Sequence, residues 1–130
     1  MQFEILTDKG TSINLVRFFM LNGKKFLIYS NVNDGADEQG RLTIHISEIN
    51  NSDNILANAV SDEDWDAVKN VIKGIVNANK NGQSLPVEDL DYNTIDGVNI
   101  IDNRSLKLMA NYVDLLKLNQ LKSLLIWLTI

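Results

Sequence analysis

Asn22-Gly23 is the feature of this sequence that most restricts its fold, because this dipeptide strongly favours a two-residue type I′ β-turn. Both central residues of such a turn need a positive φ angle, which asparagine and glycine adopt at low cost. The turn lies between two runs of large apolar residues, at 18–21 and 26–29. The sequence therefore predicts an antiparallel hairpin in which both strands contribute to a hydrophobic core.

The N-terminal residues predict a further strand joined to this hairpin. Phe3 and Ile5 alternate with polar neighbours, and Asp8-Lys9-Gly10 then supplies a glycine for a second tight turn. The run from Ile13 to Leu21 carries apolar residues on both parities from Leu15 onward. Such a strand is typically buried on both faces, so we expect both sides of the sheet to be covered here.

Strict alternation of apolar and polar residues over 42–47 predicts another strand, with one face buried and one face wet. His45, which is the single histidine of the chain, falls on the polar parity and is expected to be solvated. A weaker pattern over 55–60 predicts a fifth strand. The first sixty residues therefore indicate a meander of short antiparallel strands.

The hydrophobic period changes from two to about 3.6 at Ser61, which marks the start of a helix. Ser61 suits the N-cap, three acids follow in the first turn, and Gly82 suits the C-cap. The apolar residues at helical spacing are Trp65, Val68, Ile72, Ile75 and Val76. We expect a helix over about residues 62–80 that packs this Trp65 stripe on the sheet.

Residues 83–130 carry weaker signals. The tetrapeptide Ile95-Asp96-Gly97-Val98 predicts a small hairpin. Helical spacing resumes at Asn103 or Ser105 and predicts a second helix that ends at about Asn119.

Together these patterns predict one α+β domain over residues 1–130. Its fold is a curved antiparallel meander of four or five strands packed against one helix, with a further C-terminal helix. Residues 1–82 form the sheet and its helix, and residues 83–130 form an extension with the short hairpin and the second helix. The length fits a single core, since a chain of this size buries roughly two-thirds of the surface that it exposes when unfolded.

Composition and charge disfavour several functions. The chain has no cysteine, and therefore no disulfide, no thiolate nucleophile and no cysteine-rich zinc site. Its N-terminus lacks the basic start and apolar core of a signal peptide, and its longest apolar run, 124–128, is far shorter than the roughly 20 residues of a membrane-spanning helix. We therefore expect a cytoplasmic protein without a membrane span. Residues 33–66 carry nine acids and one base within a net charge of -5, which disfavours direct binding to nucleic acid.

An aromatic-rich strand at 25–29, an alternating strand at 42–47 and the helix start Ser61-Asp62-Glu63-Asp64-Trp65 follow one another along the chain. This order resembles the small acidic YrzB-type bacterial proteins of unknown function. The resemblance covers about residues 3–80 and does not extend beyond residue 83. It implies a compact cytosolic bacterial protein, and because no activity is assigned to the family it implies no site residues.

No catalytic or metal-binding constellation is visible in the sequence. A single histidine excludes metal sites built on paired histidines, and no phosphate loop or nucleophile elbow is present. The acidic loop 33–40 departs from the calcium loop of an EF-hand, because Gln39 stands where that loop requires glycine. Helix capping explains the acids that follow Ser61. We therefore predict no catalytic residue, no cofactor and no bound metal.

The leading functional hypothesis is a non-enzymatic or regulatory module that binds another protein or associates with itself. Its basis is the acidic middle of the chain together with the last ten residues, 121–130, of which seven are large and apolar. Those ten residues either complete the core, as a continued helix or a final strand, or form a partner surface. The residues predicted for this surface are Asp34, Asp37, Glu38, Leu124, Trp127 and Ile130.

Two alternatives from other classes stay open. The first is an inhibitor encoded by a mobile element, in which the acids of residues 33–66 imitate the phosphates of a nucleic acid. The second is an enzyme that uses His45 as a base with a nearby carboxylate. The sequence indicates no small-molecule substrate.

Overall fold

The Asn22-Gly23 hairpin forms the centre of the sheet, as predicted. A computed structural model describes residues 3–51 and 54–117 of the chain. In it, β2 (Ser12–Leu21) and β3 (Lys24–Asn31) pair in antiparallel fashion. Asn22 and Gly23 have φ angles of 53° and 78°, the positive values that a type I′ turn requires.

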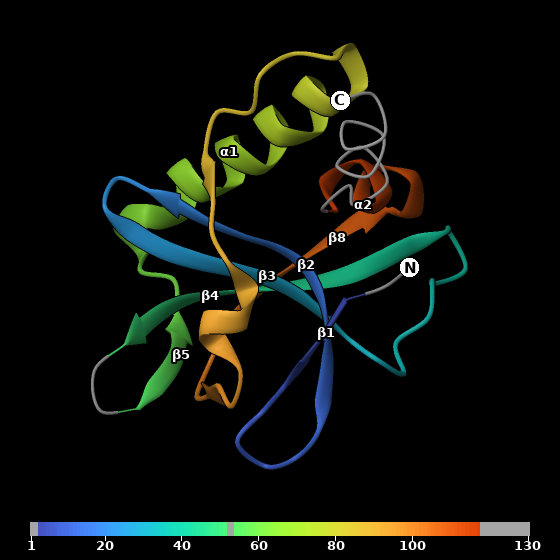
Figure 1. Ribbon diagram of the computed structural model, residues 1–130. Helices are drawn as coiled ribbons and strands as arrows, with labels where there is room; N and C mark the ends of the chain where they lie inside the picture. The colour runs from blue at the N-terminus through green and yellow to red at the C-terminus, as the bar shows by residue number, and fades with distance from the viewer. Residues whose placement is uncertain (1–2, 52–53, 118–130) are drawn as a thin grey trace, which may run out of the picture.

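The remaining predicted strands flank this hairpin and extend the meander. They are β1 (Phe3–Leu6), β4 (Arg41–Asn51) and β5 (Ile55–Ala59). The order across the sheet is β1-β2-β3-β4-β5, with every neighbouring pair antiparallel. The predicted α+β class and curved meander are therefore confirmed (Figure 1).

Three strands beyond the predicted four or five make the sheet larger and mixed. β6 (Glu88–Asp89) pairs with β2, and β8 (Arg104–Met109) pairs with β4, both in antiparallel fashion. β7 (Asn99–Ile100) runs parallel to β5. Residues from the C-terminal part of the chain thus complete the sheet that the first sixty residues begin.

The small hairpin predicted around Asp96-Gly97 is wrong. A 3-10 helix, η1 (Tyr92–Ile95), precedes this point, and Gly97 then turns the chain toward β7 with a φ of 80°. The segment pairs with the end of β1 and not with itself, because the N–H of Gly97 donates to the Leu6 carbonyl and Val98 bridges to Thr7. This pairing brings the first strand of the sheet next to a late one and curls the sheet.

The second helix begins later than the predicted Asn103 or Ser105. Residues 104–109 form β8, and α2 covers only Ala110–Leu116; the predicted end at Asn119 lies outside the described residues. Leu106 and Leu108 fit a two-residue period, whereas Leu106 and Met109 fit a helical one, so this short run is ambiguous by pattern alone. Pairing with the first half of β4 selects the strand.

The long helix α1 (Asp62–Asn81) confirms the predicted helix and both of its caps. The Ser61 side chain accepts a hydrogen bond from the N–H of Asp64, and Gly82 has a left-handed φ of 66°. The residues that α1 buries are Val68, Ile72, Ile75, Val76 and Ala78. This helix therefore presents the predicted stripe to the sheet.

Two hydrophobic clusters cover the two faces of the sheet, which explains why β2 is apolar on both parities. The first lies on the face that carries both helices (Figure 1), where Phe19, Phe26 and Ile44 pack with Ile72 and Ile75. The second lies on the opposite face, and its buried residues are Ile5, Ile13, Leu15, Phe18, Leu27, Tyr29, Ile49, Ala57, Ile95 and Val98. No helix within the described ranges is long and apolar enough to cross a membrane.

Candidate binding groove

A groove of about 370 Å³ opens to solvent between the two helices and the end of β8. Its wall is mostly apolar. The lining residues are Ile72, Lys73, Val76, Asn77 and Lys80 of α1, Leu108 of β8 and Tyr112 of α2. Tyr112 retains 42% of its exposure, so a large aromatic side chain stands partly uncovered beside the groove.

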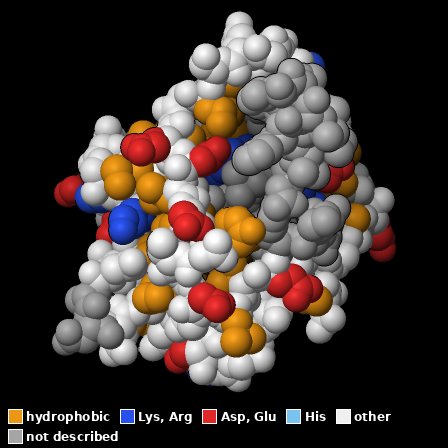
Figure 2. All heavy atoms as spheres, viewed as in Figure 1, with side chains coloured by type: hydrophobic (Ala, Val, Ile, Leu, Met, Phe, Trp, Pro, Cys, Tyr) orange, Lys and Arg blue, Asp and Glu red, His pale blue; other side chains and the backbone are white. Residues whose placement is uncertain are grey.

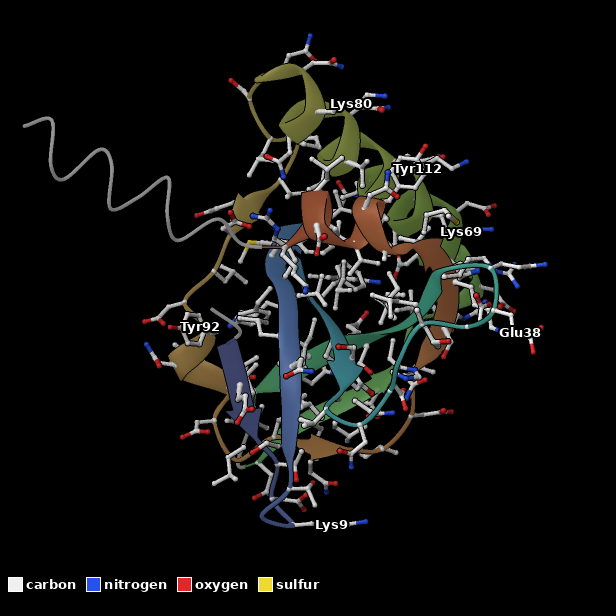
Figure 3. The ribbon with its side chains drawn as sticks, turned by 90° about the vertical axis from the view of Figure 1, so that its right-hand side faces the viewer. Lys9, Glu38, Lys69, Lys80, Tyr92 and Tyr112 are labelled. Carbon is white, nitrogen blue, oxygen red and sulfur yellow. The ribbon has the colours of Figure 1, made fainter. Side chains whose placement is uncertain are left out.

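The charged side chains on the groove wall, among the described residues, are both lysines. Lys73 and Lys80 belong to α1 and are exposed, and neither forms an ion pair with any residue that the structure describes. Figure 3 shows Tyr112 and Lys80 on the same side of the molecule, while Lys9 lies at the opposite end. An apolar floor with lysines at its edge suits an apolar segment that carries acids.

Hydrogen bonds to backbone carbonyls hold α2 in place and thereby position Tyr112. Arg17 donates through Nε to the Leu116 carbonyl and through Nη2 to the Lys117 carbonyl, each at 3.0 Å. Asn79 of α1 donates to the Leu115 carbonyl. These carbonyls lie at the C-terminal end of α2, where they have no partner within the helix.

A β-bulge in β2 aims Arg17 at this end of α2. The register between β2 and β3 shifts between Leu15 and Arg17, so that Val16 and Arg17 both face the helices. Arg17 is only 3% exposed, and its Nη1 pairs with Asp89 Oδ2 at 2.8 Å. A buried cation is thus satisfied by one carboxylate and two carbonyls.

His45 lies in a polar cluster on the face of β4 opposite the helices. Its Nδ1 is 2.8 Å from Ser105 Oγ, and its Nε2 is 3.3 Å from Asn31 Nδ2 and 3.9 Å from Asp34 Oδ2. Its ring packs on that of Tyr29, with centroids 5.3 Å apart. The prediction of a solvated histidine is wrong, because the side chain is only 15% exposed; Ser105 covers it from β8, a strand that was not predicted.

The hydrogen bonds of this cluster run in one direction. The Asn31 amide donates to His45 Nε2, so the neutral ring carries its proton on Nδ1 and donates to Ser105 Oγ. Ser105 donates in turn to Asn103, whose amide donates to the Tyr29 hydroxyl at 2.9 Å. His45 therefore gives Ser105 a hydrogen bond and does not take its proton, which is the reverse of what an activated nucleophile needs.

The three loop acids of the predicted partner surface lie together on the 32–40 loop, but one of them is held by its own loop. Asp37 accepts bonds from the Arg41 N–H at 2.8 Å and the Gln39 N–H at 3.0 Å, and it pairs with the Arg41 guanidinium at 3.0 Å. These contacts lower the pKa of Asp37 below its ordinary value of 3.8, the Arg41 N–H contributing most. Glu38 and Asp34 are exposed.

The other three predicted surface residues, Leu124, Trp127 and Ile130, lie outside the described residues, as does the whole predicted tail 121–130. Within the described ranges, no three or more carboxylate or histidine side chains gather in a way that would hold a metal ion.

Two of the three acids in the first turn of α1 form ion pairs with cations from elsewhere in the fold. Asp64 binds Lys24 Nζ at 2.6 Å, and Asp62 binds the Arg104 guanidinium. The hydrogen bond to Asp64 raises the pKa of Lys24, and the hydrogen bond from Lys24 is the main cause of a lowered pKa at Asp64. Trp65 is partly buried, with the Arg104 guanidinium 5.2 Å from its ring centroid.

The sequence interpretation missed the groove residues. Tyr112 and Leu108 were assigned to one continuous helix, so their meeting with α1 was not foreseen. A signal was present in α1, where Lys73 and Lys80 are seven residues apart and therefore share one side of the helix. Arg17 was also recognisable as a lone charge in a strand predicted to be buried on both faces.

Comparisons of the chain with protein-family models, curated proteins and solved structures found no match.

Proposed function

We propose that this chain is a non-enzymatic cytoplasmic module that binds a segment of another protein in the groove between α1, β8 and α2. The observation that carries the proposal is an open apolar groove whose charged wall residues are both lysines. The groove is exposed to solvent and few polar groups converge in it, whereas small-molecule sites enclose most of their ligand and orient it with several polar groups. A protein segment fits this shape better.

The expected partner is a segment with large apolar residues and neighbouring acids. Lys73 and Lys80 would face those acids, while the apolar side chains would contact Val76, Leu108 and Tyr112. Residues 118–130 of the chain itself are mainly apolar and contain one lysine and no acid, so their charge does not complement the groove. Charge therefore favours a segment from a different protein.

The two other functional classes receive less support. An enzyme that uses His45 as a base needs a free ring nitrogen, whereas Nδ1 bonds to Ser105, Nε2 accepts from the Asn31 amide, and the side chain is only 15% exposed. A nucleic-acid mimic needs a continuous array of free carboxylates, whereas Asp37, Asp62 and Asp64 are each paired with a cation. Figure 2 likewise shows the acids on the visible face as separate groups among apolar and polar side chains.

Selection from a phage-displayed library of random dodecapeptides tests the proposal. We expect the full chain to enrich peptides that combine aromatic or aliphatic residues with Asp or Glu. Enrichment is expected to disappear for Tyr112→Ala and for Lys73→Glu with Lys80→Glu, because these changes remove the aromatic wall and reverse the charge of the groove.

Lys9→Glu is the matched control, since it reverses an exposed lysine at the opposite end of the molecule (Figure 3). It should enrich the same peptides as the wild type. No enrichment by the wild type, or equal enrichment by the groove variants, contradicts the proposal.

A further inference from the structure

We infer that the bound segment is an extended strand that pairs with the free edge of β8. This inference rests on the proposed function and specifies the binding mode. β8 pairs with β4 along one edge, through Arg104–Met109 and Arg41–Ile46. Among the described strands, none pairs with its other edge.

The register of β8 identifies the backbone groups on this free edge. The N–H of Ala110 donates to the Gly40 carbonyl at 3.0 Å, so hydrogen-bonded pairs fall on even-numbered residues of β8. Leu106 and Leu108 therefore direct their backbone groups to β4. Ser105 and Lys107 direct their backbone N–H and carbonyl groups away from β4. Met109 also directs its N–H away from β4.

These outward groups find no backbone partner in the described fold. They are the N–H groups of Ser105, Lys107 and Met109 and the carbonyls of Ser105 and Lys107. Side chains at all three positions are exposed. A row of unpaired donors and acceptors on an exposed strand is the template that an added strand uses.

The groove lies beside this edge, so one extended segment reaches both features. Leu108 belongs to β8 and also lines the groove with Tyr112 and Val76. Side chains alternate along a strand, so every second side chain of an added strand would lie next to Leu106 and Leu108 and enter the groove. Both leucines are only partly buried although they face the helices, which leaves apolar surface for this contact.

The charges of β8 favour a partner over a second copy of this chain. The strand carries Arg104 and Lys107 and no acid. Arg104 is already paired with Asp62, so the deciding charge is Lys107: pairing two copies of β8 would bring two lysines together, whereas an acidic segment would neutralise them. An exposed lysine on an edge strand is also a common protection against self-association.

N-methylated versions of a peptide selected by the wild-type chain test this mode. Methylation at alternate residues, those whose N–H groups face β8, should weaken binding at least about tenfold, the effect of losing one or two backbone hydrogen bonds. Methylation at the intervening residues should be tolerated. Bound peptide should also slow hydrogen exchange at the Ser105, Lys107 and Met109 amides, while exchange in the distant Lys9 turn stays unchanged.

The outcomes separate this inference from the proposed function. If both sets of methylated peptides bind equally well or equally poorly, while Tyr112→Ala still loses binding, the strand mode is overturned and binding in the groove is retained. Binding that is indifferent to Tyr112→Ala contradicts both. A peptide-free dimer with protected Ser105, Lys107 and Met109 amides overturns the inference by showing that a second copy occupies the edge.

Discussion

Replacing Arg17 by methionine is expected to destabilise the protein strongly and to loosen α2. Arg17 is 3% exposed, and its guanidinium joins β2 to Asp89 and to the last carbonyls of α2. Methionine keeps an apolar side chain of similar length but donates no hydrogen bond. The variant therefore leaves Asp89 without its cation and the Leu116 and Lys117 carbonyls without their donor.

The magnitude follows from the burial of the groups left behind. Removing one partner of a buried ion pair costs about 3–5 kcal/mol, and each hydrogen bond to a charged donor contributes about 1.5–3 kcal/mol. The Asp89 side chain is 33% exposed, so water replaces part of its lost contact. We expect a loss of about 3–4 kcal/mol in the free energy of unfolding, a large share of the roughly 5–15 kcal/mol of a typical domain.

Urea denaturation followed by circular dichroism measures this loss. Arg17→Lys is the graded variant, because lysine keeps the charge but cannot make the forked contact to one carboxylate and two carbonyls, and it should fall between methionine and wild type. Arg41→Met is the control, since the Arg41–Asp37 pair is partly exposed and should matter far less. A loss below about 1 kcal/mol for Arg17→Met, the range of a surface pair, would refute the assigned role of Arg17.

Three further changes test local parts of the structure. Gly23→Ala should lower the free energy of unfolding by about 1–2 kcal/mol in a thermal denaturation assay, because Gly23 has a φ of 78° in the β2–β3 turn. Gly35→Ala is the control and should be nearly neutral, because Gly35 lies at an open position without positive φ. Burial raises the pKa of Tyr29 above its ordinary value of 10.0, so the contribution of its neutral hydroxyl to stability is present below pH 10 and is lost as the pH rises through the folded-state pKa. The stability of the wild type should therefore fall more steeply above pH 10 than that of Tyr29→Phe. Parallel stability curves for the two proteins would contradict this. Ser105→Ala should cost about 1 kcal/mol in urea denaturation, because His45 Nδ1 loses its hydrogen-bond partner; an unchanged midpoint would contradict a stabilising bond between Ser105 and His45.

Local signals in the sequence predicted the elements that depend on local chemistry. Asn22-Gly23 sets its own turn, and Ser61 and Gly82 cap α1 with their own side chain and backbone. These features need no distant partner, so residue type and order were sufficient to predict them.

The elements that depend on distant pairing were not predicted. Residues 104–109 are a strand because they pair with β4, about sixty residues earlier in the chain. The segment at Gly97 bonds to the end of β1, which lies near the N-terminus. The local pattern allows either structure, because Leu106 and Leu108 fit a strand while Leu106 and Met109 fit a helix. The groove was missed for the same reason, since it forms where α1, β8 and α2 meet.

A charge-swap binding measurement shows whether the acids of a bound peptide contact the two groove lysines. The affinity of one selected acidic peptide is measured by fluorescence anisotropy for the wild type and for the chain with Lys73→Glu and Lys80→Glu, with Lys9→Glu as the control. If the acids of the peptide contact Lys73 and Lys80, the double variant should lose at least about tenfold in affinity and recover it when those acids are replaced by lysine. Unchanged affinity in the double variant, or no recovery with the lysine peptide, would contradict binding in the groove between α1, β8 and α2.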